Sequence, residues 1–277
     1  NETSITRTVD PLAGSYYVES LTNSLIVHAE GDGGQFNHAI SQFSKQYGIQ
    51  ILAGTNKFGI GRLYQWMTLF LKMKPYAHEY KMMGLAPFSE HLIDTNTIET
   101  INSYFEVNKD SLLANKKIPK DFFYTFADIF KFSRFDVVAS TVQHVVEYNL
   151  TKLFSSLSEK YSVSSFYYGG GVAMNVKANK SIFDLNEINS LTVPFAPADE
   201  GNVLGACHYG FEKYFITSGK PLSLINENGI SPYLGSCLNK DCDISQFKNE
   251  FEISTSHDVI SNVSNMLLSG HIGAIAK

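Results

Sequence analysis

The sequence predicts an α/β protein in which helices and strands alternate around a glycine-rich turn. Phe166–Lys180 begins as an apolar strand, continues through three glycines and ends in a short helical segment. Before it, Phe135–Leu157 carries apolar side chains at helical spacing and is the longest helical pattern in the chain. Helix, strand, glycine turn and helix in succession are typical of an α/β domain.

The glycine turn, Gly169–Gly171, predicts a phosphate or nucleotide cradle. Glycines let the backbone approach a ligand closely, and a helix start offers unpaired N–H groups to an anion. Asn175 and Asn179 are four residues apart, so we expect both amides on one face of the following helix. A glycine turn that merely joins strand to helix is the alternative, because the stretch is neither a Walker A loop nor Gly-x-Gly-x-x-Gly.

A second stretch, Val193–Cys207, places two carboxylates after a proline-rich approach and before an apolar helix. Asp199 and Glu200 directly precede Gly201. Asp199 is expected either to cap this helix or to bind a metal or a nucleotide hydroxyl, and the sequence leaves both open.

The first strands are expected to form a hairpin followed by a third strand and a helix. Ser24–His28 and Gln35–Ile40 flank a turn at Glu30–Gly34 that contains Asp32. Ile49–Ala53 reads as a further strand. Arg62–Met73 reads as an amphipathic helix, whose Trp66 and methionines are interpreted as core.

The middle of the chain contains fewer residues that suggest binding or catalysis. We expect Glu79–Pro87 on a loop, where Lys81 is either a phosphate or carboxylate ligand or a solvated lysine. Residues 92–134 are expected to hold two or three helices, with the aromatic side chains of residues 122–130 in a core or, as the alternative, in a wall that faces the acceptor. His144 and Glu147 are interpreted as a pair on one helix face rather than as catalytic residues.

Towards the carboxyl end, further short elements are expected. Ser190–Val193 reads as a strand and Gly201–Tyr214 as a helix. Ile244–Phe251 and Val259–Leu268 read as helices, and His271–Ala276 as a strand.

Amino-acid composition and charge limit the classes of function that we expect for this protein. The 277 residues carry a net charge of −5 and are 44% hydrophobic, which argues against a basic nucleic-acid-binding surface. No apolar run is long enough to cross a membrane and no secretory leader opens the sequence, so we expect a cytoplasmic protein. Cys207, Cys237 and Cys242 form no Cys-x-x-Cys pair and predict reduced thiols rather than a zinc site.

Three ordered motifs resemble one family. A glycine pair followed by Val-Ala-x-Asn, then Pro-x-x-x-x-Asp-x-Gly-x-x-x-Gly-Ala, is similar to the amino-terminal domain of the O-carbamoyltransferases of nodulation-factor and antibiotic biosynthesis. Upstream, Glu79–Pro87 resembles that family's Glu-Tyr-Lys-x-Met-Gly-Leu-Ala-Pro box. The resemblance covers residues 24–277 and implies an actin/hexokinase-like, ribonuclease H-like ATPase fold, related to the enzymes that place threonylcarbamoyl on tRNA.

The resemblance implies a reaction and a set of ligands. Such enzymes move a carbamoyl group from carbamoyl phosphate, through an ATP-derived carbamoyl-adenylate, to a hydroxyl of a sugar or another small acceptor. By motif position, Gly169–Gly171, Asn175, Asp32 and Lys81 are expected near the nucleotide, with Glu79 close by, and Asp199 is expected to bind a divalent metal, iron or magnesium. The resemblance assigns no general base, so the catalytic residue stays unknown.

The chain departs from the family pattern at its start. Residues 6–22 resemble a segment of methylmalonyl-CoA mutase, although no cobalamin signature follows them. On another alignment, Ala13–Tyr17 would follow the family's His-His-x-x-His box, which would then fall on Arg7–Pro11, where histidine is absent. His28 also stands where the family has the first Asp of its glycine-rich turn. A non-catalytic nucleotide-binding module that has lost its metal-binding histidines is therefore the alternative function.

These observations predict a domain organisation. Residues 1–23 are expected to be a divergent or foreign segment, residues 24–235 the nucleotide-binding domain, and residues 236–277 a linker and the start of a second domain. The arginine-rich signature that opens the family's adenylate-forming domain is not found before Lys277, so we expect a fold that is incomplete at both ends.

Overall fold

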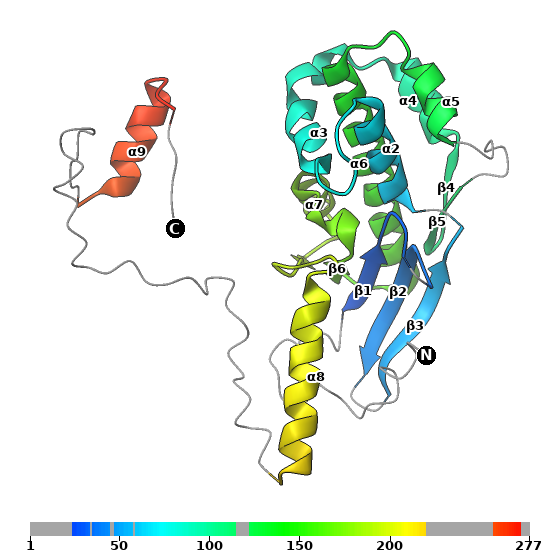
Figure 1. Ribbon diagram of the computed structural model, residues 1–277, viewed down its shortest axis with the longest axis vertical. Helices are drawn as coiled ribbons and strands as arrows, with labels where there is room; N and C mark the ends of the chain where they lie inside the picture. Colours follow the sequence, from blue (N-terminus) through cyan, green and yellow to red (C-terminus); the bar gives the residue numbers. More distant parts are fainter. Residues whose placement is uncertain are drawn as a thin grey trace. The chain divides into compact units, whose positions relative to one another are not determined.

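The computed structural model describes residues 24–33, 35–44, 47–57, 59–114, 122–219 and 257–272 (Figure 1). The chain divides into two compact units, residues 1–230 and 231–277, which are described separately. The predictions for residues 1–23, for the helix at 244–251 and for most of the strand at 271–276 lie outside the described residues, as do Cys237 and Cys242.

The first unit is built on a five-stranded sheet of order β3-β2-β1-β6-β7. Its strands are β1 (Leu25–Ala29), β2 (His38–Ser44), β3 (Gly48–Thr55), β6 (Ser165–Gly169) and β7 (Ser190–Thr192). The central strand of the first three, β2, is antiparallel to both β1 and β3, whereas β6 lies parallel to β1, and β7 parallel to β6. This mixed sheet with its helices confirms the α/β class and the expected hairpin of β1 and β2.

Helices connect the strands. They are α2 (Ile60–Phe70), α3 (Glu79–Leu85), the 3-10 segment η3 (Ala86–Leu92), α4 (Thr95–Asn102), α5 (Phe122–Ile129), α6 (Phe135–Tyr161), the 3-10 turn η4 (Gly171–Met174), α7 (Val176–Phe183) and α8 (Gly201–Thr217). The Glu79–Pro87 segment was therefore wrongly expected on a loop. It begins with α3, because Met82 needs the helical turn to reach its fully buried position.

The long helix α6 organises the core. Its predicted apolar stripe is confirmed, with all seven side chains buried: Val138, Val142, Val145, Val146, Leu150, Leu153 and Leu157. Phe154 of α6 packs edge-on against Phe166 and Tyr168 of β6, each with ring centroids 5.1 Å apart. Such burial stabilises by about 1.5–3 kcal/mol for each large apolar side chain, so α6 and β6 hold one another in place.

The predicted aromatic core at residues 122–130 is confirmed only in part. Phe126 and Phe130 are fully buried, whereas Tyr124 is exposed. Phe122 stacks on Trp66 with ring centroids 5.3 Å apart, which joins α5 to α2. Trp66 and Met67 therefore belong to the core, as expected.

A small hairpin corrects the all-helical expectation for residues 92–134. β4 (Phe105–Asn108) pairs antiparallel with β5 (Ser111–Ala114). Lys109 adopts a left-handed conformation (φ 53°) at its turn. Ser156 of α6 donates to the Lys109 carbonyl at 2.6 Å, and Lys160 pairs with Asp110. Contacts with α6, distant in sequence, thus hold this turn.

The second unit contains α9 (Val259–Leu268), with the bounds that the sequence predicts. Asp258 caps this helix by accepting the N–H of Ser261 at 3.0 Å. Across the described ranges, none of the helices is both long enough and apolar enough to cross a membrane.

Candidate functional site

Three loops meet at one edge of the sheet. Because β1, β6 and β7 are parallel, the loops that follow them leave the sheet at the same edge. The chain proceeds from β1 to β2 on one side, while β6 and β7 lie on the other, so the strand order switches direction between β1 and β6. Ligands of open α/β sheets bind beyond the carboxyl ends of strands at such a switch point.

The glycine turn after β6 is tightly fitted to its neighbours. Gly170 adopts φ 93°, and a Cβ atom there would lie 2.2 Å from the carbonyl oxygen of Ala29. Its N–H donates to the carbonyl of Pro197 at 2.7 Å, which ties the loop after β7 to the turn. At Gly169 a Cβ atom would meet only the Pro197 oxygen at 3.7 Å. Glycine is thus required at position 170 but not at position 169.

The third glycine is held by a carboxylate that sequence reasoning missed as a site residue. The Gly171 N–H donates to Glu30 at 2.6 Å. Glu30 follows β1, and its side chain is one-fifth exposed, with the His28 imidazole 3.9 Å away. The sequence did hold one signal for Glu30, namely its position directly after a buried strand at the edge where the strand order switches. This carboxylate already satisfies the Gly171 N–H.

Asp32 lies on the exposed side of the same loop. Its carboxylate pairs with Arg62 of α2, and the Arg62 Nε donates to the Gly31 carbonyl at 3.3 Å. The start of α2 lies against this loop, since a Cβ atom at Gly59 would lie 2.4 Å from the Glu30 carbonyl oxygen. The positive end of the helix dipole therefore faces the acidic loop.

Asn175 lies outside the helix in which it was expected and acts as the N-cap of α7. Its Oδ1 accepts the N–H of Ala178 at 3.0 Å. The same amide forms a reciprocal pair with Gln143 of α6, at 3.0 and 3.1 Å. Asn179 donates to the Ala173 carbonyl at 2.7 Å, which holds the 3-10 turn against α7. Both asparagines therefore brace the turn in this structure.

Gln143 is the centre of a buried polar network. The sequence pattern did not reveal it, because a single polar residue within the apolar stripe of α6 carries no signal of its partners. The Gln143 amide also contacts the Tyr64 hydroxyl and the Glu147 carboxylate. Burial raises the pKa of Tyr64 far above its usual range, so this phenol stays protonated and can donate. The network connects α2, α6 and α7 behind the glycine turn.

Asp199 lies on the loop that leads into α8. Glu200 is the N-cap, and α8 begins without a hydrogen bond from its side chain. The Asp199 carbonyl accepts the N–H of Asn202 at 3.1 Å, and both acidic side chains are exposed. A Cβ atom at Gly201 would lie 2.4 Å from the Ala196 carbonyl oxygen, so glycine closes this loop.

Lys81 and Glu79 lie on α3. The Lys81 ammonium is exposed and lies 5.8 Å from the centroid of the Tyr80 ring. Glu79 accepts the N–H of Tyr76 at 2.6 Å. The contacts of the glycine turn described above are instead with Glu30 and Pro197, on the loops after β1 and β7.

The loops at this edge of the sheet offer carboxylates as metal ligands. Within the described ranges, no group of three or more His, Cys, Asp or Glu side chains converges on a point. Magnesium usually keeps several waters and needs one or two carboxylates besides substrate phosphates, and carboxylates lie on the loops after β1 and β7.

Comparisons with known proteins agree with the motifs. A family model described as carbamoyltransferase N-terminus matches residues 13–208. An uncharacterized protein of Synechocystis, sll1178, is 27% identical over 178 residues, which are 56% of this chain and 28% of that protein. Another from Methanocaldococcus jannaschii, MJ1051, is 27% identical over 202 residues, 69% of this chain and 37% of that one.

This chain thus spans about a third of the length of these curated relatives. The matched residues contain the sheet, the glycine turn and the Asp199 loop described above. The chain belongs to the carbamoyltransferase family, and its residues 13–208 match the amino-terminal domain of that family.

Proposed function

We propose that this chain binds a nucleotide at the carboxyl edge of its sheet and takes part in carbamoyl transfer. The transfer would run from carbamoyl phosphate, through a carbamoyl-adenylate, to a hydroxyl of a sugar or another small acceptor. The observation that carries this proposal is the meeting of three loops at the switch point, around a glycine turn whose backbone is fixed by Ala29 and Pro197.

We also assign the sheet to the actin/hexokinase-like, ribonuclease H-like fold. The order β3-β2-β1-β6-β7, with three antiparallel strands followed by two parallel ones, supports this assignment together with family membership.

The residues at this edge have distinct proposed roles. The backbone of Gly169–Gly171 would approach the phosphates, and Asn175 would hold the turn in shape through α7 and Gln143. Asp32 and Lys81 remain proposed nucleotide contacts, of which Asp32 is the one on a loop of the switch edge. The acceptor oxygen would form a bond to the carbamoyl carbon, while adenylate leaves and the hydroxyl proton passes to a base.

A divalent metal is part of the proposal. When bound, magnesium would offset phosphate charge and polarise the carbamoyl carbonyl. Asp199 is exposed on the loop that Pro197 ties to Gly170, so its carboxylate could reach a metal on the phosphates without displacing a packed group.

Isothermal titration with ATP, with and without magnesium, tests the proposal. We expect binding in the micromolar range only with magnesium, weakened about tenfold or more in Asp199→Asn. Glu200→Gln is the matched control, because it neutralises the neighbouring exposed carboxylate and should leave the affinity unchanged. Absence of ATP binding in both conditions would reject a nucleotide site here.

The second candidate function is a nucleotide-binding module without catalysis. Its basis is the sequence, in which Arg7–Pro11 contains no histidine and His28 stands where the family has an Asp. An assay of carbamoyl transfer from carbamoyl phosphate and ATP to a panel of sugars separates the two. Magnesium-dependent ATP binding without any transfer product would support the module.

A further inference from the structure

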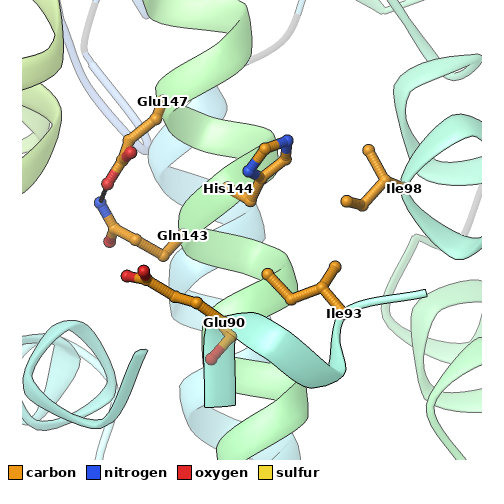
Figure 2. Close-up of a pocket in the computed structure, with 7 residues that line it drawn as sticks. Glu90, Ile93, Ile98, Gln143, His144 and Glu147 are labelled. Atoms are coloured by element: carbon orange, nitrogen blue, oxygen red, sulfur yellow. Dashed lines mark hydrogen bonds between the residues drawn. The ribbon is translucent and has the colours of Figure 1, made fainter. Parts of the chain in front are cut away.

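A cavity of about 260 Å³ lies between η3, α4 and α6, apart from the loops of the switch edge. Figure 2 shows six of the side chains that line it: Glu90, Ile93, Ile98, Gln143, His144 and Glu147. Glu90 comes from η3, Ile98 from α4 and the last three from α6. The cavity is open to solvent on one side, and a neighbouring pocket of about 530 Å³ shares Ile98 and His144 with it. A ligand the size of a monosaccharide fits this space.

The cavity carries one carboxylate whose charge is not balanced. Glu90 pairs with Lys177 at 2.8 Å. Glu147 forms no ion pair with the described part of the chain, although Gln143 and Ser181 donate hydrogen bonds to it, Ser181 at 3.1 Å. These neutral donors fix the orientation of the carboxylate without cancelling its charge. A half-buried carboxylate in this position attracts a cation.

The two sides of the cavity differ in chemistry. Glu90, Gln143 and Glu147 lie on one side in Figure 2, whereas His144 and the two isoleucines lie on the other. A matching ligand has a positive group at one end, hydroxyl groups that can hydrogen-bond to an imidazole, and a C–H surface for Ile93 and Ile98. A bare metal ion would leave the isoleucine side unused.

We propose that this cavity is a binding site for a small hydroxyl-bearing organic amine. The ammonium group would pair with Glu147 on the side of the cavity that Glu90 also lines, and the carbon skeleton would lie along the isoleucines. The site goes beyond the proposed function and does not rest on it. Gln143 nevertheless bonds both to Glu147 and to Asn175, so occupation of the cavity should reach the glycine turn through one side chain.

The test uses two probes that differ in a single group. Glucamine carries an ammonium where sorbitol carries a hydroxyl, so the pair isolates the effect of charge. The full chain is titrated with each probe up to about 10 mM, while the imidazole proton resonances of His144 are followed by NMR. We expect saturable shifts with glucamine and at least tenfold weaker binding of sorbitol.

Variants locate the site. Glu147→Gln retains an oxygen that can accept from Gln143 and Ser181, and it should weaken glucamine binding about tenfold. Glu90→Gln is the second variant and should weaken it as well. Glu159→Gln, at an exposed position on the same helix, should not change it. Equal binding of both probes, unchanged affinity in both glutamine variants, or no shift at the highest concentration would overturn the proposal.

Discussion

The carboxylate of Glu30 accepts the backbone N–H of Gly171 at 2.6 Å and thereby joins the ends of β1 and β6. A charged acceptor on a backbone N–H forms a strong bond, and it repels any second anion that approaches the same group. The glycine turn is therefore not an empty phosphate cradle. An anion must displace Glu30, or a cation must lie between them.

The first prediction concerns that competition. Glu30→Gln keeps an oxygen for the Gly171 N–H but removes the negative charge, so affinity for ATP without metal should rise about tenfold. The dependence on magnesium should fall in parallel. Titration calorimetry on the variant measures both effects, with exposed Glu159→Gln as the charge-matched control. A loss of metal-free affinity in Glu30→Gln would contradict this account.

The second prediction tests the fit of the glycine turn. Gly170→Ala places a Cβ atom against the Ala29 carbonyl. It also forces alanine into a backbone conformation, φ 93°, that side-chain-bearing residues rarely adopt. The free energy of unfolding should fall by about 2 kcal/mol or more. Gly169→Ala meets only an ordinary contact and should cost less than about 1 kcal/mol. Urea unfolding of both variants gives the comparison, and equal losses would show that the turn relaxes.

The third prediction separates the two roles of Asn175. Asn175→Ala removes both the cap of α7 and the pair with Gln143, whereas Asn175→Ser restores a capping oxygen alone. Serine should recover about 1 kcal/mol of the loss.

The pair itself is measured by a double-mutant cycle with Gln143→Ala. We expect a coupling energy of about 1 kcal/mol between Asn175 and Gln143. Strictly additive losses would show that the reciprocal amide contact contributes nothing to stability.

The fourth prediction concerns pH. His38 is buried against the hairpin turn, where its Nε2–H donates to the Asp110 carbonyl at 3.2 Å. Burial lowers the pKa of His38 below its ordinary value, an effect that the Asp110 carbonyl partly opposes. The unfolded chain therefore binds a proton more readily below about pH 6.5. The contribution of neutral His38 to the free energy of unfolding should be fully present above that pH. Below it, the free energy of unfolding should fall by up to about 1.4 kcal/mol for each pH unit.

His38→Gln removes this titration and should flatten the loss of stability between about pH 6.5 and pH 5. His91→Gln, which changes an exposed imidazole, should leave the profile as it is. Thermal unfolding followed across the pH range provides the measurement. An unchanged slope in His38→Gln would assign the pH dependence to other groups.

Periodicity and turn chemistry predicted the strands and the long helix, because each is encoded in consecutive residues. The hairpin of β4 and β5 could not be found that way. Leu112, Leu113 and Ala114 suit a helix, and only the contacts of Lys109 and Asp110 with α6 favour the turn. Glu79–Pro87 was misassigned for a related reason, since burial of Met82 by tertiary packing decides its helical state.

For the candidate site, motif order pointed to the glycine turn, Asn175 and Asp32 but not to their side-chain partners. Glu30, Gln143 and Arg62 act through side chains that meet across the fold, and no local pattern marks such pairs. Glu147 was interpreted as part of a helix-face pair with His144. The cavity that both line depends on η3 and α4, whose positions the sequence alone does not give.

The parallel pairing of β1 with β6 has a consequence for synthesis of the protein. Leu25 pairs with Phe166, and all of β2 to α6 lies between them. At roughly 5–20 residues per second, the ribosome delivers β6 on the order of ten seconds after β1. During that interval β1, already paired with β2, would present the unpaired N–H and C=O groups of its other edge to solvent and to neighbouring nascent chains. Yield in cells should accordingly depend on holding chaperones and on growth temperature.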